Sequence, residues 1–302
     1  PSKKDKNNNY NFSLTMEMNV SNELVEVAQK KKGGLNPAII LPILYVIALS
    51  IYVFVLGNPG NFKADPRLTG ASVALADVES KELTPEGFMG IIYMGGPVVH
   101  ILILFMITVI VFSFERFFVL NRAQGKGSLD AFVIKVRSLL NQNKVDEALE
   151  ECDRQQGTVG NVVREGLTTY KALAKDTTLN KEQKMAALNK SIEEATTLEM
   201  PMLEKNMMIL STLGTVATLV ALLGTVIGMI KAFHALGSGG GTPDAAALSI
   251  GISEALINTA LGIGTSAIAI ILYNFFTSKI DGMTYKIDEI SMSIQQSFAE
   301  FN

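Results

Sequence analysis

The sequence predicts an all-α integral membrane protein with four transmembrane helices and long helices that extend into the cytoplasm. The 302 residues are 48% hydrophobic and only 18% charged, which is more apolar than a soluble domain of this size. The charged residues also leave four long gaps, at residues 33–62, 87–114, 206–230 and 255–278. No segment alternates between apolar and polar residues as a half-buried strand does.

The first gap illustrates why each is interpreted as a membrane span. Residues 37–57 form an almost unbroken apolar run of 21 residues, and a helix rising about 1.5 Å per residue needs about 20 residues to cross a hydrocarbon core of about 30 Å. A cleaved signal peptide is the alternative, because three lysines precede the run. Such segments have shorter apolar cores and begin nearer the N-terminus, so we expect a span.

The order of segments follows from these gaps. We expect a disordered cytoplasmic Lys/Asn-rich tail (1–36), an extra N-terminal transmembrane helix (37–57), a periplasmic loop (58–94), a second transmembrane helix (95–120), a cytoplasmic helical domain (121–205), a third transmembrane helix (206–235), a short periplasmic loop (236–249), a fourth transmembrane helix (250–278) and a cytoplasmic C-terminal helix (279–302).

Basic residues indicate the orientation, because Lys and Arg near membrane spans tend to stay in the cytoplasm. Six lie in the tail and fourteen in residues 115–205, against three in residues 58–86 and one in residues 231–254. Both termini and the long middle segment are therefore expected in the cytoplasm.

The middle segment is predicted to be helical. Apolar residues in 128–143 fall on one helix face, and Ser128 offers an N-cap oxygen. Shorter helices are expected over 145–154 and 159–174. From Lys181 we expect one helix that continues into the third span, with a kink near Pro201.

Composition excludes several classes of function. The 26 basic and 29 acidic residues nearly balance, which argues against a nucleic-acid binder. The single cysteine, Cys152, cannot form an internal disulfide, and with two histidines it cannot build a Cys/His zinc site. We expect neither a cofactor nor a metal. An enzyme is disfavoured because the Gly-rich run 237–242 lacks the lysine of a phosphate-binding loop and no nucleophile and base pair is evident.

The last two spans are rich in small and hydroxylated residues. On the third span a hydroxyl stripe forms at 100° per residue, made of Ser211, Thr215, Thr218 and Thr225. On the fourth, polar residues gather on one side, namely Glu254, Asn258, Thr259, Thr265 and Ser266. Such stripes either line a wet or protein-facing surface, which we favour for the four hydroxyls, or let helices pack closely. Gly224, Gly228 and Gly262 are the candidates for close packing.

Carboxylates are missing from the middle of all four spans. Glu254 lies at the outer end of the fourth span. It has either a functional role or only a structural one, as an interfacial cap that the helix dipole favours at a helix N-terminus. Because intramembrane carboxylates usually mark ion paths, any proton path here needs a titrating group from a partner.

Two motifs carry a family resemblance. The stretch LLGTVIGMIKAF (222–233), and EALINTALG (254–262) followed by Tyr273 and Asn274, closely resemble the paired signatures of the MotA/TolQ/ExbB proton-channel family, most of all its ExbB branch. The segments 146–167 and 193–219 look like the cytoplasmic helices of that family, so the likeness covers about residues 95–298.

The resemblance implies a function. It implies a ring of five subunits in the bacterial inner membrane, around the transmembrane helices of an ExbD-like partner whose Asp carries protons, with motion passed to a TonB-like protein. Position by position, Thr225 and Thr259 match the pore threonines of ExbB-type proteins, and Glu254 matches the glutamate at the periplasmic end of the pore. Such hydroxyls can hydrogen-bond either protonation state of a carboxyl group.

The sequence also departs from the family pattern. Thr218 and Ile268 stand where relatives usually carry prolines, so the pore helices are expected to be straighter. The first span is additional to the three-span ExbB plan. Three alternatives stay open: a TolQ-like envelope-integrity motor, a MotA-like motility stator and a non-conducting membrane scaffold.

Overall fold

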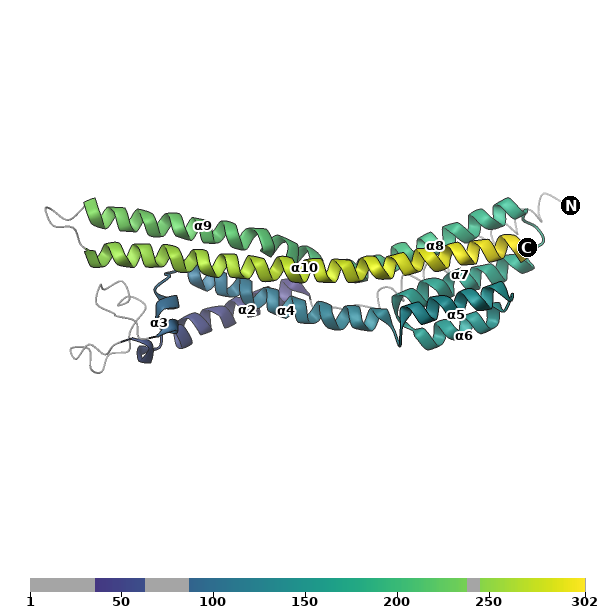
Figure 1. Cartoon of the computed structure of the whole chain (residues 1–302), viewed down its shortest axis with the longest axis horizontal. Helices are drawn as coiled ribbons and strands as arrows, with labels where there is room; N and C mark the ends of the chain where they lie inside the picture. Colours follow the sequence, from purple (N-terminus) through teal and green to yellow (C-terminus); the bar gives the residue numbers. More distant parts are fainter. Residues whose placement is uncertain (1–35, 63–86, 238–244, 302) are drawn as a thin grey trace, which may run out of the picture. The chain divides into compact units, whose positions relative to one another are not determined.

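The computed structural model describes residues 36–62, 87–237 and 245–301. Within these ranges the chain forms helices and no strand (Figure 1), which confirms the all-α prediction for this part of the chain. Four helical stretches among the described residues are long and apolar enough to cross a membrane, beginning at Pro37, Val98, Met207 and Ala247. The protein is therefore a membrane protein. Nearly all of the predicted tail (1–36), most of the first predicted periplasmic loop (58–94) and half of the second (236–249) lie outside the described residues.

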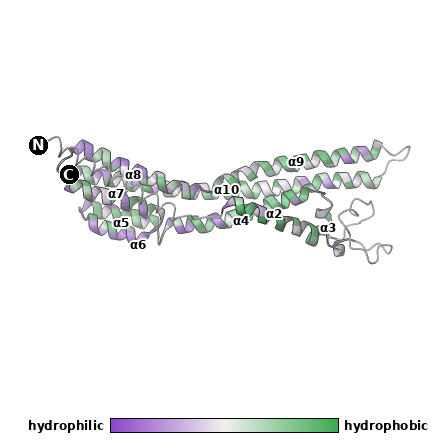
Figure 2. Ribbon diagram, turned by 180° about the vertical axis from the view of Figure 1, so that it is seen from behind, coloured by the Kyte–Doolittle hydropathy of each residue, from purple (hydrophilic) through white to green (hydrophobic). Residues whose placement is uncertain are grey.

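The helices divide into two units. We call residues 35–124 and 204–285 the apolar unit, and residues 125–203 and 286–302 the charged unit. Hydrophobic residues dominate α2, α4 and α9, whereas hydrophilic residues recur along α5 to α8 (Figure 2). Each unit is described by itself below.

The apolar unit contains the predicted spans. Its elements are α2 (Pro37–Ser50), the π-helix η1 (Ile51–Leu56), the short 3₁₀ turn η2 (Pro59–Asn61), α3 (Phe88–Tyr93), α4 (Val98–Gln124), α9 (Met207–Gly237) and the first part of α10 (Ala245–Phe301). Asn36 caps α2 by accepting a hydrogen bond from the Ala38 amide at 3.1 Å, and Pro37 occupies the first turn, where no amide hydrogen is needed.

Helix α4 packs against α2 on one side and α9 on another. Val98 and Leu102 of α4 are buried against Ala221 of α9, while Val99 and Ile103 are buried with Tyr52 of η1. The second span begins at Val98 rather than at the predicted residue 95, because Gly95 and Gly96 form a turn between α3 and α4.

The charged unit consists of α5 (Leu129–Asn141), α6 (Val145–Gln155), α7 (Gly157–Lys175), α8 (Lys181–Glu204, up to Leu203) and the end of α10. These helices match the predicted ones within a few residues. Ser128 precedes α5, but its side chain makes no capping hydrogen bond. A side-chain cap is present at another helix, α8, where Asn180 and Gln183 form a capping box with reciprocal bonds of 2.8 and 3.1 Å.

Large side chains fill the interior of the charged unit. Tyr170 of α7 meets Phe298 of α10 edge to face at 4.9 Å between ring centroids. Cys152 is also buried, and burial raises the pKa of its thiol to about 12. The thiol is therefore protonated and unreactive near neutral pH.

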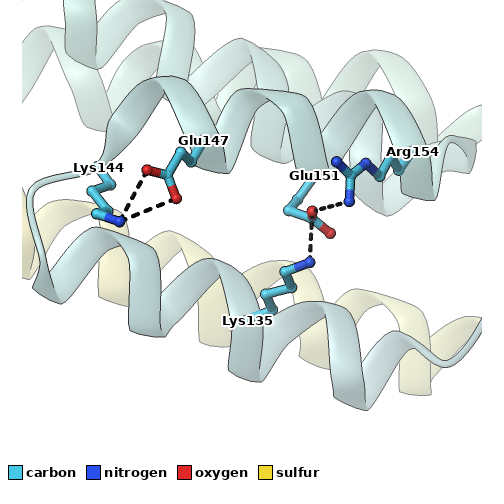
Figure 3. A network of polar contacts seen from close by, with 5 residues as sticks. All are labelled: Lys135, Lys144, Glu147, Glu151 and Arg154. Atoms are coloured by element: carbon cyan, nitrogen blue, oxygen red, sulfur yellow. Dashed lines mark hydrogen bonds and ion pairs between the residues drawn. The ribbon is translucent and has the colours of Figure 1, made fainter.

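Ion pairs lie along α6 on the surface of this unit, and one of them joins α6 to α5 (Figure 3). Glu151 accepts from Lys135 at 2.7 Å and from Arg154 at 2.9 Å. Lys144 pairs with Glu147 at 3.0 Å. Most of these side chains are largely exposed, so the network contributes little to stability.

The prediction of one continuous helix from Lys181 into the third span is wrong. Helix α8 includes Pro201 and ends at Glu204, and α9 begins at Met207. Between them Asn206 has a φ of +62°, a left-handed conformation that asparagine tolerates better than most residues. The break therefore falls after the proline and not at it.

Candidate functional site at the contact of α9 and α10

Thr225 of α9 and Thr259 of α10 lie in direct contact. Their hydroxyl oxygens share a hydrogen bond. Thr259 also reaches the Ala255 carbonyl at 3.0 Å, and Thr225 reaches the Ala221 carbonyl at 3.0 Å. Each hydroxyl has one proton and two lone pairs, so the pair can rearrange its bonds without losing all its partners. Both side chains are half-buried.

Glycines bring the two helices close together around this pair. A Cβ added to Gly224 would lie 2.9 Å from the Asn258 side chain, and one on Gly228 would lie 2.8 Å from the Ala255 amide nitrogen. At Gly262 a Cβ would overlap the Cβ of Ala221. Figure 1 shows α9 running beside the first part of α10. The contact therefore has no room for larger side chains at these three positions.

Glu254 forms an ion pair with Lys231 of α9. The Lys231 Nζ lies 2.9 and 3.0 Å from the two carboxylate oxygens. The Glu254 side chain is only 5% exposed, whereas that of Lys231 is 51% exposed. Helix α10 begins at Ala245, so Glu254 lies well inside the helix. The alternative of a helix N-terminal role is therefore wrong.

Asn258 and Ser266 use their side chains to bond other elements. The Asn258 amide donates to the Gly95 carbonyl at 2.9 Å, and the Ser266 hydroxyl donates to the Gly214 carbonyl of α9. Both residues are buried. Thr265 is buried as well, but its hydroxyl bonds the Leu261 carbonyl of its own helix at 2.8 Å.

The rest of the hydroxyl stripe is separate from this pair. Thr225 faces α10. The other three hydroxyl side chains are exposed in the single chain, namely those of Ser211, Thr215 and Thr218. The structure thus brings one member of the stripe to the candidate site and leaves three on an open face of α9. Whether that face is wet or in contact with protein stays a prediction.

Three contacting residues were missed by sequence reasoning. They are Gly95 and Gly96, which face α10, and Tyr52, whose hydroxyl donates to the Gly96 carbonyl at 3.1 Å. The sequence offered one signal, because the run Gly95–Gly96–Pro97 is typical of a turn. Nothing local in the sequence indicates Tyr52, whose partner lies 44 positions away.

Comparison with known proteins bears on the same helices. Residues 155–289 match the family model of the MotA/TolQ/ExbB proton channel family. A biopolymer transport protein ExbB homolog of Methanothermobacter thermautotrophicus is 30% identical over 153 residues, which cover 51% of this chain and 50% of the relative. Biopolymer transport protein ExbB of Xanthomonas campestris pv. campestris is 34% identical over 37% of this chain and 44% of the relative.

A third relative is the Tol-Pal system protein TolQ of Pseudomonas aeruginosa, which is 27% identical over 60% of this chain and 79% of the relative. The chain spans about half the length of the two ExbB relatives. Every candidate residue on α9 and α10 falls within the matched segment. Residues 155–289, and with them the contact of α9 and α10, therefore resemble the MotA/TolQ/ExbB proton channel family, as the two motifs predicted.

Proposed function

We propose that this chain is an ExbB-like subunit of a proton-driven motor in the bacterial inner membrane, and that it is not an enzyme. With an ExbD-like single-span partner it uses the proton-motive force to energise TonB-dependent transport across the outer membrane. The observation that carries the proposal is the hydroxyl pair of Thr225 and Thr259, which joins α9 to α10 within the matched segment.

In this proposal the hydroxyl pair receives the carboxyl group of the partner. Each threonine hydroxyl can donate a hydrogen bond to a carboxylate or accept a hydrogen bond from a carboxylic acid. The switch needs only small movements, because the Ala255 carbonyl lies 3.0 Å from Thr259 and 3.4 Å from Thr225 and can take up the released donor. A charge that crosses the membrane is worth about 2.3 kcal/mol per 100 mV, which can bias the partner between equivalent sites.

The remaining candidate residues have supporting roles. Glu254, paired with Lys231 at 2.9 Å, lies at the outer end of the path, and the exposed hydroxyls of Ser211, Thr215 and Thr218 continue it along α9. Asn258 and Ser266 fix α10 through their bonds to Gly95 and Gly214. Gly224, Gly228 and Gly262 allow the close approach of the two helices.

We further propose a homopentamer with the N- and C-termini in the cytoplasm. Five equal subunits would give the smaller partner equivalent sites. Native mass spectrometry of the detergent-extracted chain, alone and with an ExbD-like partner, tests this proposal. A closed ring that captures the partner supports it. A monomer or dimer that ignores such partners leaves the non-conducting scaffold as the better hypothesis.

Proton flux into proteoliposomes then tests the hydroxyl pair. We expect Thr225→Val and Thr259→Val to lower the flux about tenfold or more, because a hydrogen bond to a charged group contributes about 1.5–3 kcal/mol and about 1.4 kcal/mol is tenfold. Thr265→Val is the matched control, since that hydroxyl bonds only within its own helix turn. Unchanged flux in both test variants, with the ring intact, contradicts the proposed path.

Labelling from one side of the membrane tests the orientation. Ser138 on α5 and Gly237 at the end of α9 are both exposed, and each can be replaced by cysteine. Native Cys152 need not be removed, because it is buried and burial raises its pKa. In spheroplasts we expect an impermeant maleimide to label Gly237→Cys and not Ser138→Cys. The reverse pattern contradicts the orientation.

A TolQ-like function is the second candidate, and the long alignment with the Pseudomonas aeruginosa TolQ favours it. Both candidates use the same pore and differ in partners. Capture of a Tol-Pal system partner in preference to an ExbD-type one, measured in the same mass-spectrometry experiment, supports the TolQ-like function.

A further inference from the structure

One tyrosine of the additional first span is hydrogen-bonded to the turn between α3 and α4. Tyr52 lies in η1, is only 8% exposed, and stacks on Tyr93 with ring centroids 4.8 Å apart. Its hydroxyl donates to the Gly96 carbonyl at 3.1 Å. Because a buried phenol hydroxyl needs a hydrogen-bond partner, this bond specifies where the first span meets the turn between α3 and α4.

That turn packs directly on α10. Gly96 has a φ of +75°, and a Cβ there would lie 2.9 Å from the carboxyl carbon of Glu254. A Cβ on Gly95 would lie 2.8 Å from the Ile257 side chain. Only glycine combines this backbone conformation with this space, so the turn touches α10 through its backbone.

The two carbonyl groups of the turn bond different helices. The Gly95 carbonyl accepts from the Asn258 amide of α10 at 2.9 Å. The Gly96 carbonyl accepts from Tyr52 of the first span and also from the Val99 amide of α4 at 3.2 Å. Consecutive residues of one tight turn cannot move independently. A shift of the Gly96 carbonyl therefore shifts the acceptor of Asn258.

Asn258 depends on that acceptor. Its side chain is fully buried, and its amide oxygen has no hydrogen-bond partner among the described residues. The amide nitrogen bond to Gly95 is thus what orients the side chain. Thr259 of the hydroxyl pair is the next residue along α10, and Glu254 lies one helical turn before Asn258.

We propose that Tyr52 is a positioning residue, by which the additional first span holds the Gly95–Gly96 turn against Glu254 and Asn258. The span thereby takes part in the site formed by α9 and α10 rather than serving only as a lipid-facing helix. The importance of that site for conduction rests on the proposed function. The series of contacts that leads from Tyr52 through Gly96 to Glu254 does not depend on it.

The test is carbodiimide modification of Glu254 in the full chain, measured by mass spectrometry as the N-acylurea or as the amide with Lys231. Tyr52→Phe keeps the stacked ring and removes the hydroxyl. We expect modification of Glu254, now 4% exposed, to become about fivefold faster, the change expected from the loss of one neutral hydrogen bond.

Tyr45→Phe is the matched control, because Tyr45 is 44% exposed on the same span and its ring forms a T-shaped pair with His100, with ring centroids 6.3 Å apart. Its modification rate should equal that of the unaltered chain. Gly96→Ala disturbs the turn directly and should also speed the reaction. Adding Tyr52→Phe to Gly96→Ala should then change the rate little, because both act through the same turn.

Proton flux measured on the same variants separates the two proposals. Faster modification together with a lower flux supports both. Faster modification in a chain that never conducts supports the positioning role and overturns the proposed function alone. Equal modification rates in the unaltered chain and Tyr52→Phe overturn the positioning role, whatever the flux.

Discussion

The apolar unit and the charged unit hold their helices together in different ways. Where α9 meets α10, the contact is made by small residues such as Gly262 and Ala221. In the charged unit, large side chains such as Tyr170 and Phe298 meet in the interior. The difference follows from the surroundings. In lipid there is no hydrophobic force between helices, so close backbone packing stabilises them, whereas in water the burial of large apolar side chains does.

Polar side chains differ between the units as well. In the apolar unit Asn258 and Ser266 are buried and each bonds a backbone carbonyl of another element. In the charged unit polar contacts such as Lys171 with Asp146 lie largely exposed. The charged unit has a buried bond of this kind too, from the Ser297 hydroxyl to the Leu140 carbonyl at 3.1 Å, but its ion pairs lie at the surface. The comparison teaches that buried polar groups specify position in both units, and that the charged unit adds exposed ion pairs.

The largest expected effect is in the interior of the charged unit. Phe298→Ala removes a ring that is fully buried against Tyr170, and such truncations cost about 3–5 kcal/mol. We expect faster hydrogen exchange in peptides of α7 and of the end of α10. Peptides of α9 should be unaffected, because α9 belongs to the apolar unit.

Phe301→Ala is the control for this change, because Phe301 lies on the same helix but is 40% exposed. We expect a change of at most about 0.5 kcal/mol, as for most surface substitutions. If Phe298→Ala speeds exchange in α9 as much as in α7, the two units do not have separate stabilities and the comparison between them fails.

The next effect concerns close packing in the apolar unit. In Gly262→Ala the new methyl group would overlap Ala221 and lie 2.8 Å from the Ala217 carbonyl oxygen. Overpacking of this kind costs about 1–3 kcal/mol. We expect a lower unfolding temperature in detergent and faster hydrogen exchange along α9.

Gly264→Ala gives a matched comparison two residues along α10, since a Cβ there meets nothing within 4 Å. Alanine is favoured over glycine in a helix interior by about 1 kcal/mol, so this variant should be neutral or slightly more stable. Equal destabilisation by both substitutions would show that α10 is disturbed by the loss of glycine itself and not by contact with α9.

These contacts also indicate how far the sequence could be interpreted. The spans could be predicted because unbroken apolar runs report membrane crossing without reference to the rest of the fold. Thr225 and Thr259 could each be selected by helix face and family resemblance. Their direct hydrogen bond could not, because it depends on how α9 and α10 are rotated and shifted relative to each other.

Two other features show the same limit. The interruption of the helix at Asn206 was missed because asparagine is compatible with a helix, and the nearby Pro201 was the stronger local signal. The bond from Tyr52 to Gly96 was missed because it joins residues 44 positions apart. Local sequence patterns specify helices and faces, but contacts between distant segments depend on tertiary packing.

The smallest expected effect is in the surface ion pairs of the charged unit. Glu151→Gln weakens the contacts with Lys135 and Arg154, whose side chains are 52% and 68% exposed. We expect a loss of about 0.2–1 kcal/mol, because solvent screens exposed ion pairs, and a smaller loss in high salt. Hydrogen exchange of α5 and α6 at low and high salt measures both. A loss above about 2 kcal/mol that persists at 1 M salt, where the Debye length is about 3 Å, would mean that Glu151 acts as a buried charge. The charged unit would then rely on position-specific polar contacts as the apolar unit does.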